Sequence, residues 1–257
     1  MTDIKSILLK WTYTPKNCIE EPISILFEGG TLKIEQGSAL ATIDPLAYQA
    51  DATIRERLTG KIESRLRAVQ IMTHKKFELS RASRTDVRID GKKHYHLEVD
   101  SVIQDTTLGS VDVVVKNEDG NVVSDTKMER LAKQEWYAVL IEKFRSSDAT
   151  LGHMLQSYQA SVSDPDNELV HLYEIRDSLA SKLGSKKSAV RQLNISNSQW
   201  DAIGELANQS SLKQGRHRGK SAGSLRDAKV AELEEARKSV VLLIEKYLEY
   251  LDANQSH

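Results

Sequence analysis

The chain contains few cysteines, prolines and aromatic residues. Its 257 residues include one cysteine, four prolines and 5% aromatic residues. A single thiol cannot form an internal disulfide, and neither a zinc-type cysteine pattern nor a nearby base accompanies Cys18. We therefore expect Cys18 to be structural or incidental, because a catalytic thiolate needs a base within reach.

Long apolar runs and targeting signals are missing as well. A run such as VVLLI at 240–244 is far shorter than the roughly 20 residues of a membrane span. The N-terminus, MTDIKSILLKWTYTP, lacks a basic leader followed by an apolar stretch and a cleavage site. The sequence also lacks a Walker loop, a dinucleotide-binding glycine fingerprint and a calcium loop. We expect a cytoplasmic protein without a membrane partner, a metal or another cofactor.

Positive and negative charges are nearly equal in number, the composition is typical of a globular protein, and the two halves of the chain show different patterns. Lys and Arg number 36, Asp and Glu number 37, and 39% of residues are hydrophobic. Residues 1–123 show alternating apolar and polar residues in runs such as SILLKWTYT and KHYHLEV, with Gly29-Gly30, Gln36-Gly37, Asp90-Gly91 and Asp119-Gly120 at turn positions. This pattern predicts an antiparallel β-rich domain. Within it, the segment from Ala52 to Leu66 is expected to be a helix followed by a strand.

Residues 124–257 are instead predicted to be helical. Ser124 or Asp125 can cap a helix whose apolar residues recur every fourth position, from Met128 through Ala132, Trp136 and Leu140 to Phe144. Asp164-Pro165 starts a second helix, whose face of Leu172, Ile175, Leu179 and Leu183 stops at Gly184. The two halves together predict an α+β protein, an N-terminal antiparallel β-rich domain at 1–123 followed by a C-terminal helical bundle at 124–257.

A helix, a tight turn and a second helix are predicted within KKSAVRQLNISNSQWDAIGELANQ at 186–209. Asn194 suits a turn position with left-handed backbone, and Ile195 is expected to be buried. Ser196 and Gln199 are expected to form a capping box. The spacing resembles a DNA-binding helix-turn-helix, but Asp201 and Glu205 on the second helix would face phosphates. Both an ordinary helical hairpin and a DNA-reading one remain open.

The last predicted helix, 227–251, carries a short heptad seam that only Arg237 interrupts. Its apolar residues are Val230, Leu233, Val240, Ile244, Tyr247 and Leu251, and Leu242, Leu243 and Leu248 widen the face. The seam fits either packing within its own domain or a homodimer formed through this helix.

A basic loop, defined as residues 212–226 with the sequence LKQGRHRGKSAGSLR, connects that hairpin to the last helix. It contains no acidic residue, and three glycines let the main chain approach a ligand closely. We expect its arginines to disfavour protonation of His217 between them. A phosphate backbone and the acidic residues of AELEE at 231–235 and Asp177 are alternative partners for this charge. The candidate anion-binding residues are Lys213, Arg216, His217, Arg218, Lys220 and Arg226.

Three segments, HLYEIRDSLASKLG, QGRHRGK and LLIEKYLEYL, carry a family resemblance over roughly the last 90 residues. This region resembles the helical C-terminal domain of uncharacterised bacterial proteins and is similar to HEPN-like domains of the abortive-infection type. The resemblance implies a helical bundle that acts either as a ribonuclease or as an inactive binding module. Catalytic members use an Arg and a His about four to six residues apart, whereas the matching Arg216 and His217 are adjacent.

A second group of histidines lies in the first half. His94 and His96 alternate on one face of a predicted strand, a spacing that metals use, and His74 is the candidate for a third ligand. Paired histidines on a half-exposed strand usually bind nothing, so we predict no metal.

The leading functional prediction is a non-enzymatic bacterial protein that binds RNA or another polyanion through the basic loop. The alternatives are a HEPN-like ribonuclease of a defence system, a homo-oligomeric scaffold assembled through the last helix, and a helix-turn-helix DNA binder.

Overall fold

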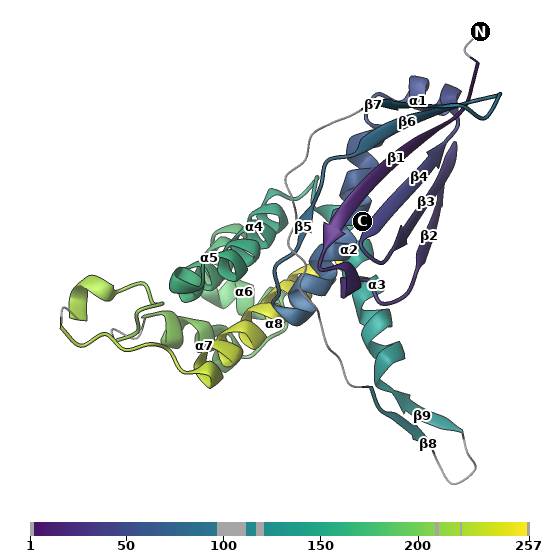
Figure 1. Ribbon diagram of the computed structural model, residues 1–257. Helices are drawn as coiled ribbons and strands as arrows, with labels where there is room; N and C mark the ends of the chain where they lie inside the picture. The colour runs from purple at the N-terminus through teal and green to yellow at the C-terminus, as the bar shows by residue number, and fades with distance from the viewer. Residues whose placement is uncertain (1–2, 97–111, 117–120, 209–210, 222, 256–257) are drawn as a thin grey trace. The chain divides into compact units, whose positions relative to one another are not determined.

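The computed structural model describes residues 3–96, 112–116, 121–208, 211–221 and 223–255. The chain forms two compact units: residues 1–69 with 77–138, called here the sheet unit, and residues 70–76 with 139–257, called the helical unit. An antiparallel sheet is followed by packed helices, which confirms the predicted α+β class (Figure 1). Among the described residues, no helix is long and apolar enough to cross a membrane.

The main sheet of the sheet unit has the strand order β2-β3-β4-β1-β6-β7, with β5 also paired to β1. Its pairs are all antiparallel, and Gly29, Gly37 and Gly91 adopt positive φ in the turns, as the alternation and turn residues predict. The strands are β1 (Ile4–Thr14), β2 (Ile23–Phe27), β3 (Gly30–Glu35), β4 (Ser38–Ile43), β5 (Glu78–Leu79), β6 (Ser83–Arg88) and β7 (Lys93–His96), and a 3-10 helix η1 (Lys16–Cys18) follows β1.

Two helices, α1 (Pro45–Ala50) and α2 (Ile54–Thr73), follow the first four strands. Asp44 caps α1 by accepting hydrogen bonds from the backbone N–H groups of Leu46 and Ala47. The prediction of a strand before Leu66 was wrong, because α2 continues as a helix through this region. Apolar residues recur every fourth position from Ile54 through Leu58 and Ile62 to Leu66, and this spacing places them on one helical face.

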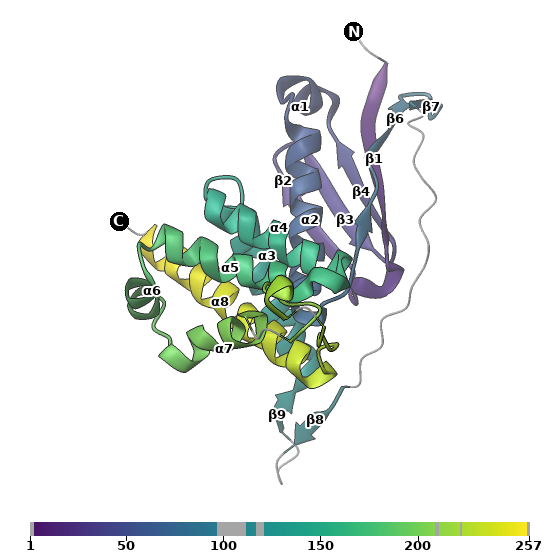
Figure 2. The same cartoon turned by 90° about the vertical axis from the view of Figure 1, so that its left-hand side faces the viewer.

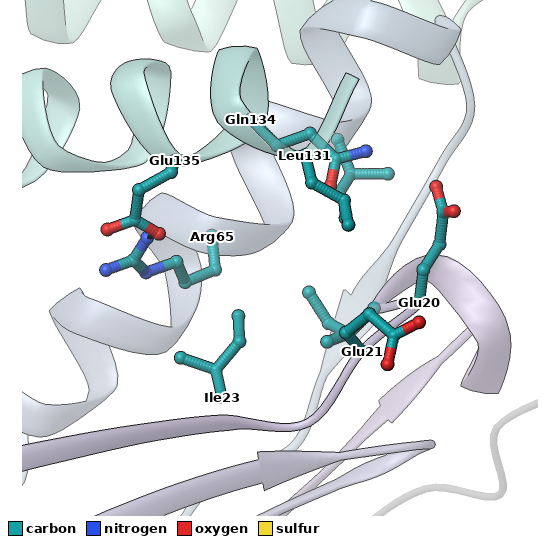
Figure 3. A pocket seen from close by; sticks show the side chains of 9 residues that line it. Glu20, Glu21, Ile23, Arg65, Leu131, Gln134 and Glu135 are labelled. Carbon is teal, nitrogen blue, oxygen red and sulfur yellow. Dashed lines mark hydrogen bonds and ion pairs between the residues drawn. The ribbon is translucent and has the colours of Figure 1, made fainter. Parts of the chain in front are cut away.

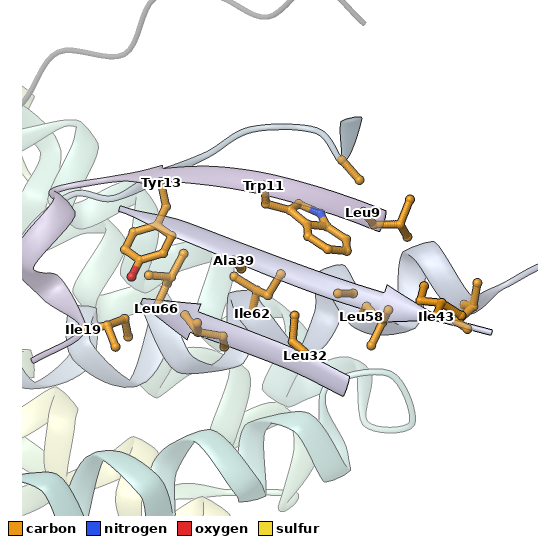
Figure 4. Close-up of a cluster of buried hydrophobic side chains, with 14 of the residues drawn as sticks. Leu9, Trp11, Tyr13, Ile19, Leu32, Ala39, Ile43, Leu58, Ile62 and Leu66 are labelled. Carbon is orange, nitrogen blue, oxygen red and sulfur yellow. The ribbon is translucent and has the colours of Figure 1, made fainter. Parts of the chain in front are cut away.

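The core of the sheet unit lies between that face of α2 and the sheet (Figure 4). Successive odd-numbered residues of β1, from Ile7 to Tyr13, point into it, as a half-buried strand requires. Trp11 is fully buried and donates its indole N–H to Thr59 Oγ1 of α2 at 3.0 Å. Cys18 is also buried, and burial raises its thiol pKa to about 12, which keeps the thiol protonated at neutral pH.

A separate two-stranded sheet, β8 (Val114–Lys116) and β9 (Val122–Asp125), precedes α3 (Thr126–Phe144). The predicted turn at Asp119-Gly120 and the end of the KHYHLEV run lie outside the described residues. Asp125 caps α3 by accepting from two backbone N–H groups, as predicted. The predicted apolar face is wrong at its start, because Met128 and Ala132 are exposed; Leu140 and Phe144 are buried.

The remaining elements of the helical unit are α4 (Ala149–Ser163), η2 (Pro165–Asn167), α5 (Glu168–Lys182), α6 (Lys186–Gln192), α7 (Asn197–Asn208), η3 (Arg218–Ser221) and α8 (Val230–Asn254). Pro165 begins η2, the 3-10 turn directly before α5, and Gly184 with positive φ follows the end of α5. Leu172, Ile175 and Leu179 are fully buried, which confirms the predicted apolar face of this helix.

The last helix, α8, packs against α5 and α7 within its own unit (Figure 2). Its buried residues are Ala236, Val240, Leu243, Ile244, Tyr247 and Leu248. The N-terminal end of the predicted seam does not pack against another helix of the described residues, because Val230 is 72% exposed. Internal packing therefore takes up most of the apolar face, and a homodimer formed through this helix stays a prediction.

Candidate polyanion-binding site

The basic loop is closed at its base by main-chain hydrogen bonds. Lys213 N donates to Arg226 O at 2.9 Å, and Arg226 N donates to Ser211 O at 2.7 Å. Farther along, Arg216 N donates to Ala207 O of α7 at 2.8 Å. These bonds bring the two ends of the loop together and attach it to α7 at Arg216.

Three of the six predicted site residues pair with carboxylates. Lys213 Nζ lies 2.9 Å from Asp227 Oδ2, and Arg216 Nη1 lies 3.6 Å from Asp177 Oδ2. Arg226 makes a bidentate pair with Glu232 at 2.7 and 2.8 Å. Hydrogen bonds from Arg226 and from the Lys229 N–H lower the pKa of Glu232 to about 2. Two of these carboxylates, Asp177 and Glu232 of AELEE, are the intramolecular partners that one of the two alternatives predicted, whereas Asp227 was not predicted.

Arg218 is held differently, by neutral oxygen atoms. Its guanidinium donates to Gly215 O at 3.1 Å, to Asp166 O at 3.0 Å and to the side-chain oxygen of Asn167. Lys220 lies in η3, and its side chain is outside the described part of the chain. His217 is half-buried between Arg216 and Arg218.

Sequence reasoning missed an aromatic side chain beneath the loop. The Arg216 guanidinium lies over the ring of Tyr173 on α5, with Cζ 4.0 Å from the ring centroid. Arg176, one turn later on α5, has its Cζ 5.1 Å from the same ring. Two guanidinium groups thus share one half-buried phenol ring. The sequence signal was available, because Tyr173, Arg176 and Asp177 lie within one turn of a predicted helix.

Arg176 also contacts the helical hairpin. Its Cζ lies 5.4 Å from the Trp200 ring centroid, and a Cβ at position 204 would come within 2.3 Å of Arg176 Nη1. Glycine at 204 therefore gives the guanidinium room against α7. Arg176 Nε and Trp200 Nε1 are buried without a hydrogen-bond partner among the described residues. We infer that the geometry around Arg176 is fixed by packing and charge more than by hydrogen bonds.

The helical hairpin at 186–209 forms as predicted. Asn194 has φ of 50°, and Ile195 is buried. Ser196 Oγ accepts from Gln199 N at 3.1 Å, while Gln199 Oε1 accepts from Ser196 N at 2.8 Å, which completes the capping box. Asp201 pairs with Lys186 and Glu205 is exposed, so α7 presents carboxylates where a DNA-reading helix would face phosphates.

A buried ionic cluster of the helical unit explains why the seam of α8 is interrupted at Arg237. This side chain forms a bidentate pair with Glu168 at 2.6 and 2.8 Å. His74 Nε2 lies 3.3 Å from the same carboxylate, and His74 Nδ1 lies 3.3 Å from the Tyr158 hydroxyl. Burial alone would raise the pKa of Glu168, but hydrogen bonds from His74 and Arg237 outweigh it and hold this pKa below its usual value.

The sheet unit contains a cavity of about 180 Å³ between α2, α3 and the start of β2 (Figure 3). Arg65 crosses its wall, forms an ion pair with Glu135 and leaves its Nε without a hydrogen-bond partner among the described residues. Glu20 and Glu21 at the opposite side pair with Arg130 and Lys127. The charged side chains that line the cavity thus all form ion pairs, and most of its other lining residues are apolar.

Asp86, buried on β6, lies beside His94 and His96 of β7, and their donor atoms all lie within 4.8 Å of one another. His74, the predicted third ligand, instead contacts Glu168 and Tyr158 in the helical unit.

Comparison with protein-family models, with curated proteins and with solved structures finds no significant match to this chain.

Proposed function

We propose that the chain is a non-enzymatic binding protein that contacts single-stranded RNA, or a similar polyanion, through the basic loop and Tyr173. The observation that carries this proposal is the stacking of Arg216 on the Tyr173 ring at 4.0 Å, next to a cationic loop with a closed base. Single strands are bound where cations follow the backbone and aromatic rings stack on bases. Arg216 and Arg218 supply the cations, and the Arg216 guanidinium that lies over Tyr173 supplies a planar group on which a base can stack.

The intramolecular ion pairs of the loop are compatible with this proposal. The pairs of Lys213 and Arg216 join side chains that are more than a third exposed. Exposed pairs of this kind contribute about 0–1 kcal/mol each, because water and salt screen them. A phosphodiester backbone can therefore replace Asp227 or Asp177 as the partner at small cost. The competing carboxylates predict moderate affinity and a strong dependence on salt.

The test compares binding of a labelled single-stranded RNA pool between 50 and 200 mM salt. The double variant Arg216→Ala/Arg218→Ala should bind more weakly by roughly tenfold and show a salt slope shallower by about 1 to 2. The control, Lys143→Ala/Lys238→Ala, removes two positive charges elsewhere on the helical unit and should leave the slope unchanged. An unchanged slope in the loop variant would contradict the proposal.

The contribution of stacking is separable from that of charge. Arg216→Lys keeps the positive charge but loses the planar group that lies over Tyr173. It should lower affinity for RNA several-fold with little change of the salt slope, and Tyr173→Leu should do the same. If Arg216→Lys and Tyr173→Leu both bound RNA as tightly as the unaltered chain, only charge would be recognised.

The ribonuclease alternative, with Arg216 and His217 as its catalytic pair, stays a prediction. It is tested by examining the labelled RNA of the binding experiment for cleavage on a gel. The non-enzymatic proposal expects intact RNA at every protein concentration. Cleavage that disappears in His217→Ala would favour the ribonuclease.

A further inference from the structure

The edge of the main sheet formed by β6 and β7 carries polar side chains on the face that elsewhere holds the core. In the antiparallel register, Ile7 pairs with Asp86 and Asp86 pairs with His94. Directly paired residues point to the same face, and so do residues two apart on one strand. His96, two residues after His94, therefore lies on this face too. Strand pairing and the alternation along β7 thus gather three residues of metal-ligating types, one Asp and two His, on this face.

Two of the three distances between the donor atoms match those around a single ion, and all three atoms lie within 4.8 Å of one another. His94 Nδ1 lies 3.4 Å from His96 Nε2, and His96 Nε2 lies 3.2 Å from Asp86 Oδ2. For bonds of about 2.1 Å to zinc, neighbouring ligands of a tetrahedral ion are about 3.4 Å apart. Hydrogen bonding explains the arrangement less well, because a neutral imidazole has only one N–H and His96 Nε2 faces two acceptor-capable atoms. An ion accepts all three lone pairs at once.

We propose that Asp86, His94 and His96 bind a divalent transition-metal ion of the zinc type. Two imidazole nitrogens and one carboxylate oxygen are ligands that such ions prefer, whereas magnesium and calcium prefer oxygen ligands throughout. Three protein ligands leave a further coordination position for water. The site lies within the sheet unit and does not depend on RNA binding by the helical unit.

Arg84 is the positioning residue of this site. Its Nε lies 2.7 Å from Asp86 Oδ1 and its Nη2 lies 3.0 Å from Oδ2, so the carboxylate is held by two parallel bonds. The Arg84 guanidinium in turn lies over the Tyr48 ring of α1 at 4.8 Å. Such an outer partner orients a ligand, but its positive charge also competes with the ion for the carboxylate. We therefore expect a dissociation constant on the order of 1 µM, weaker than that of a four-ligand structural site.

The test is a zinc titration of the full chain, freed of metal by chelation and carrying no affinity-tag histidines, in competition with a chromophoric chelator. One zinc ion per chain should bind saturably. His94→Ala and His96→Ala should each weaken binding at least tenfold. Cobalt should give the visible absorption of a nitrogen- and oxygen-ligated ion in the unaltered chain, and the double variant His94→Ala/His96→Ala should lose it.

Two matched controls accompany these variants. Tyr95→Ala changes a 62% exposed residue of the same strand on its opposite face, and His171→Ala removes a histidine that lies 3.3 Å from Asp164 and 3.6 Å from Glu174. Both should bind zinc as the unaltered chain does. The proposal is overturned by the absence of saturable binding, or by full binding in the double variant His94→Ala/His96→Ala.

Discussion

Glu168 is a buried carboxylate of the helical unit, 2% exposed, that contacts both Arg237 and His74. Breaking a buried ion pair leaves the remaining charge without compensation and costs several kcal/mol. Arg237 is partly exposed, so we place the cost of Glu168→Gln at about 2 to 4 kcal/mol of unfolding free energy at pH 7. Urea unfolding of the two proteins measures this difference.

The same substitution should change how stability depends on pH. The pKa of Glu168 is lower in the folded chain than its ordinary value of 4.5, so its contribution is complete above that value. It is lost as pH falls from 4.5 through the folded pKa. Glu168→Gln should therefore lose less stability than the unaltered chain between pH 5 and pH 3. Parallel pH profiles for the two proteins would contradict this assignment.

At the residue scale, the sequence predicts those features that depend only on residues nearby in the chain. The capping box at Ser196 and the left-handed Asn194 depend on neighbours within three residues, and both were found. The partners of Arg237 and Tyr173 could not be found in this way. Glu168 is 69 positions before Arg237, and Arg216 is 43 positions after Tyr173, so these pairs exist only once the helices pack.

At the scale of elements, the turn between α6 and α7 offers a sharp test. Asn194 is exposed and has φ of 50°, so substitutions there change backbone strain without changing packing. Asn194→Val should cost about 1 to 2 kcal/mol of unfolding free energy, because a β-branched residue is strained in the left-handed region. Asn194→Gly should stay within about 0.5 kcal/mol, since glycine reaches this region freely. Thermal or urea unfolding measures both, and equal costs would show that strain is not the cause.

Helix length was harder to predict than helix position. The prediction stopped the first long helix before Leu66, whereas α2 continues to Thr73. Its final turns contain Val69 and Ile71, β-branched residues that favour strands by their own preference. Packing decides such a segment: Val69 is buried with the core of the sheet unit, and Ile71 accepts the hydroxyl hydrogen bond of Tyr158 in the helical unit. Neither contact can be read from the local pattern.

The metal ligands show the same limit at the scale of the sheet. The spacing of His94 and His96 was recognised as one that metals use, but no metal was predicted. Asp86 was not considered, because it joins the two histidines only through the register of β6 with β7. That register depends on the hairpin turn, where Gly91 has positive φ. The third ligand can therefore be found from the sequence when both strands and their turn are predicted and the pairs of the hairpin are counted outward from Asp90.

At the scale of the whole molecule, residues 70–76 belong to the helical unit, although residues 70–73 form the end of α2, whose earlier residues belong to the sheet unit. Glu168→Gln should therefore speed amide hydrogen exchange in residues 70–76 together with residues 139–255, while residues 4–43 keep their protection. The reciprocal variant, Leu32→Ala in the core of the sheet unit, should speed exchange in residues 4–43 and spare residues 70–76. Hydrogen exchange read by mass spectrometry separates these segments. Uniform acceleration in either variant would mean that the two units unfold as one.

The chain crosses between its two units three times, at residues 69–70, 76–77 and 138–139. The helical unit is consequently not a contiguous stretch of polypeptide, and a fragment that begins at residue 139 lacks the His74 imidazole that Glu168 contacts. Transferring this unit to another protein would require either the intact chain or a rearranged order of segments in which 70–76 is spliced to 139–257. A fusion that joins part of this chain to another protein at a single point therefore cannot transfer the whole helical unit without residues of the sheet unit.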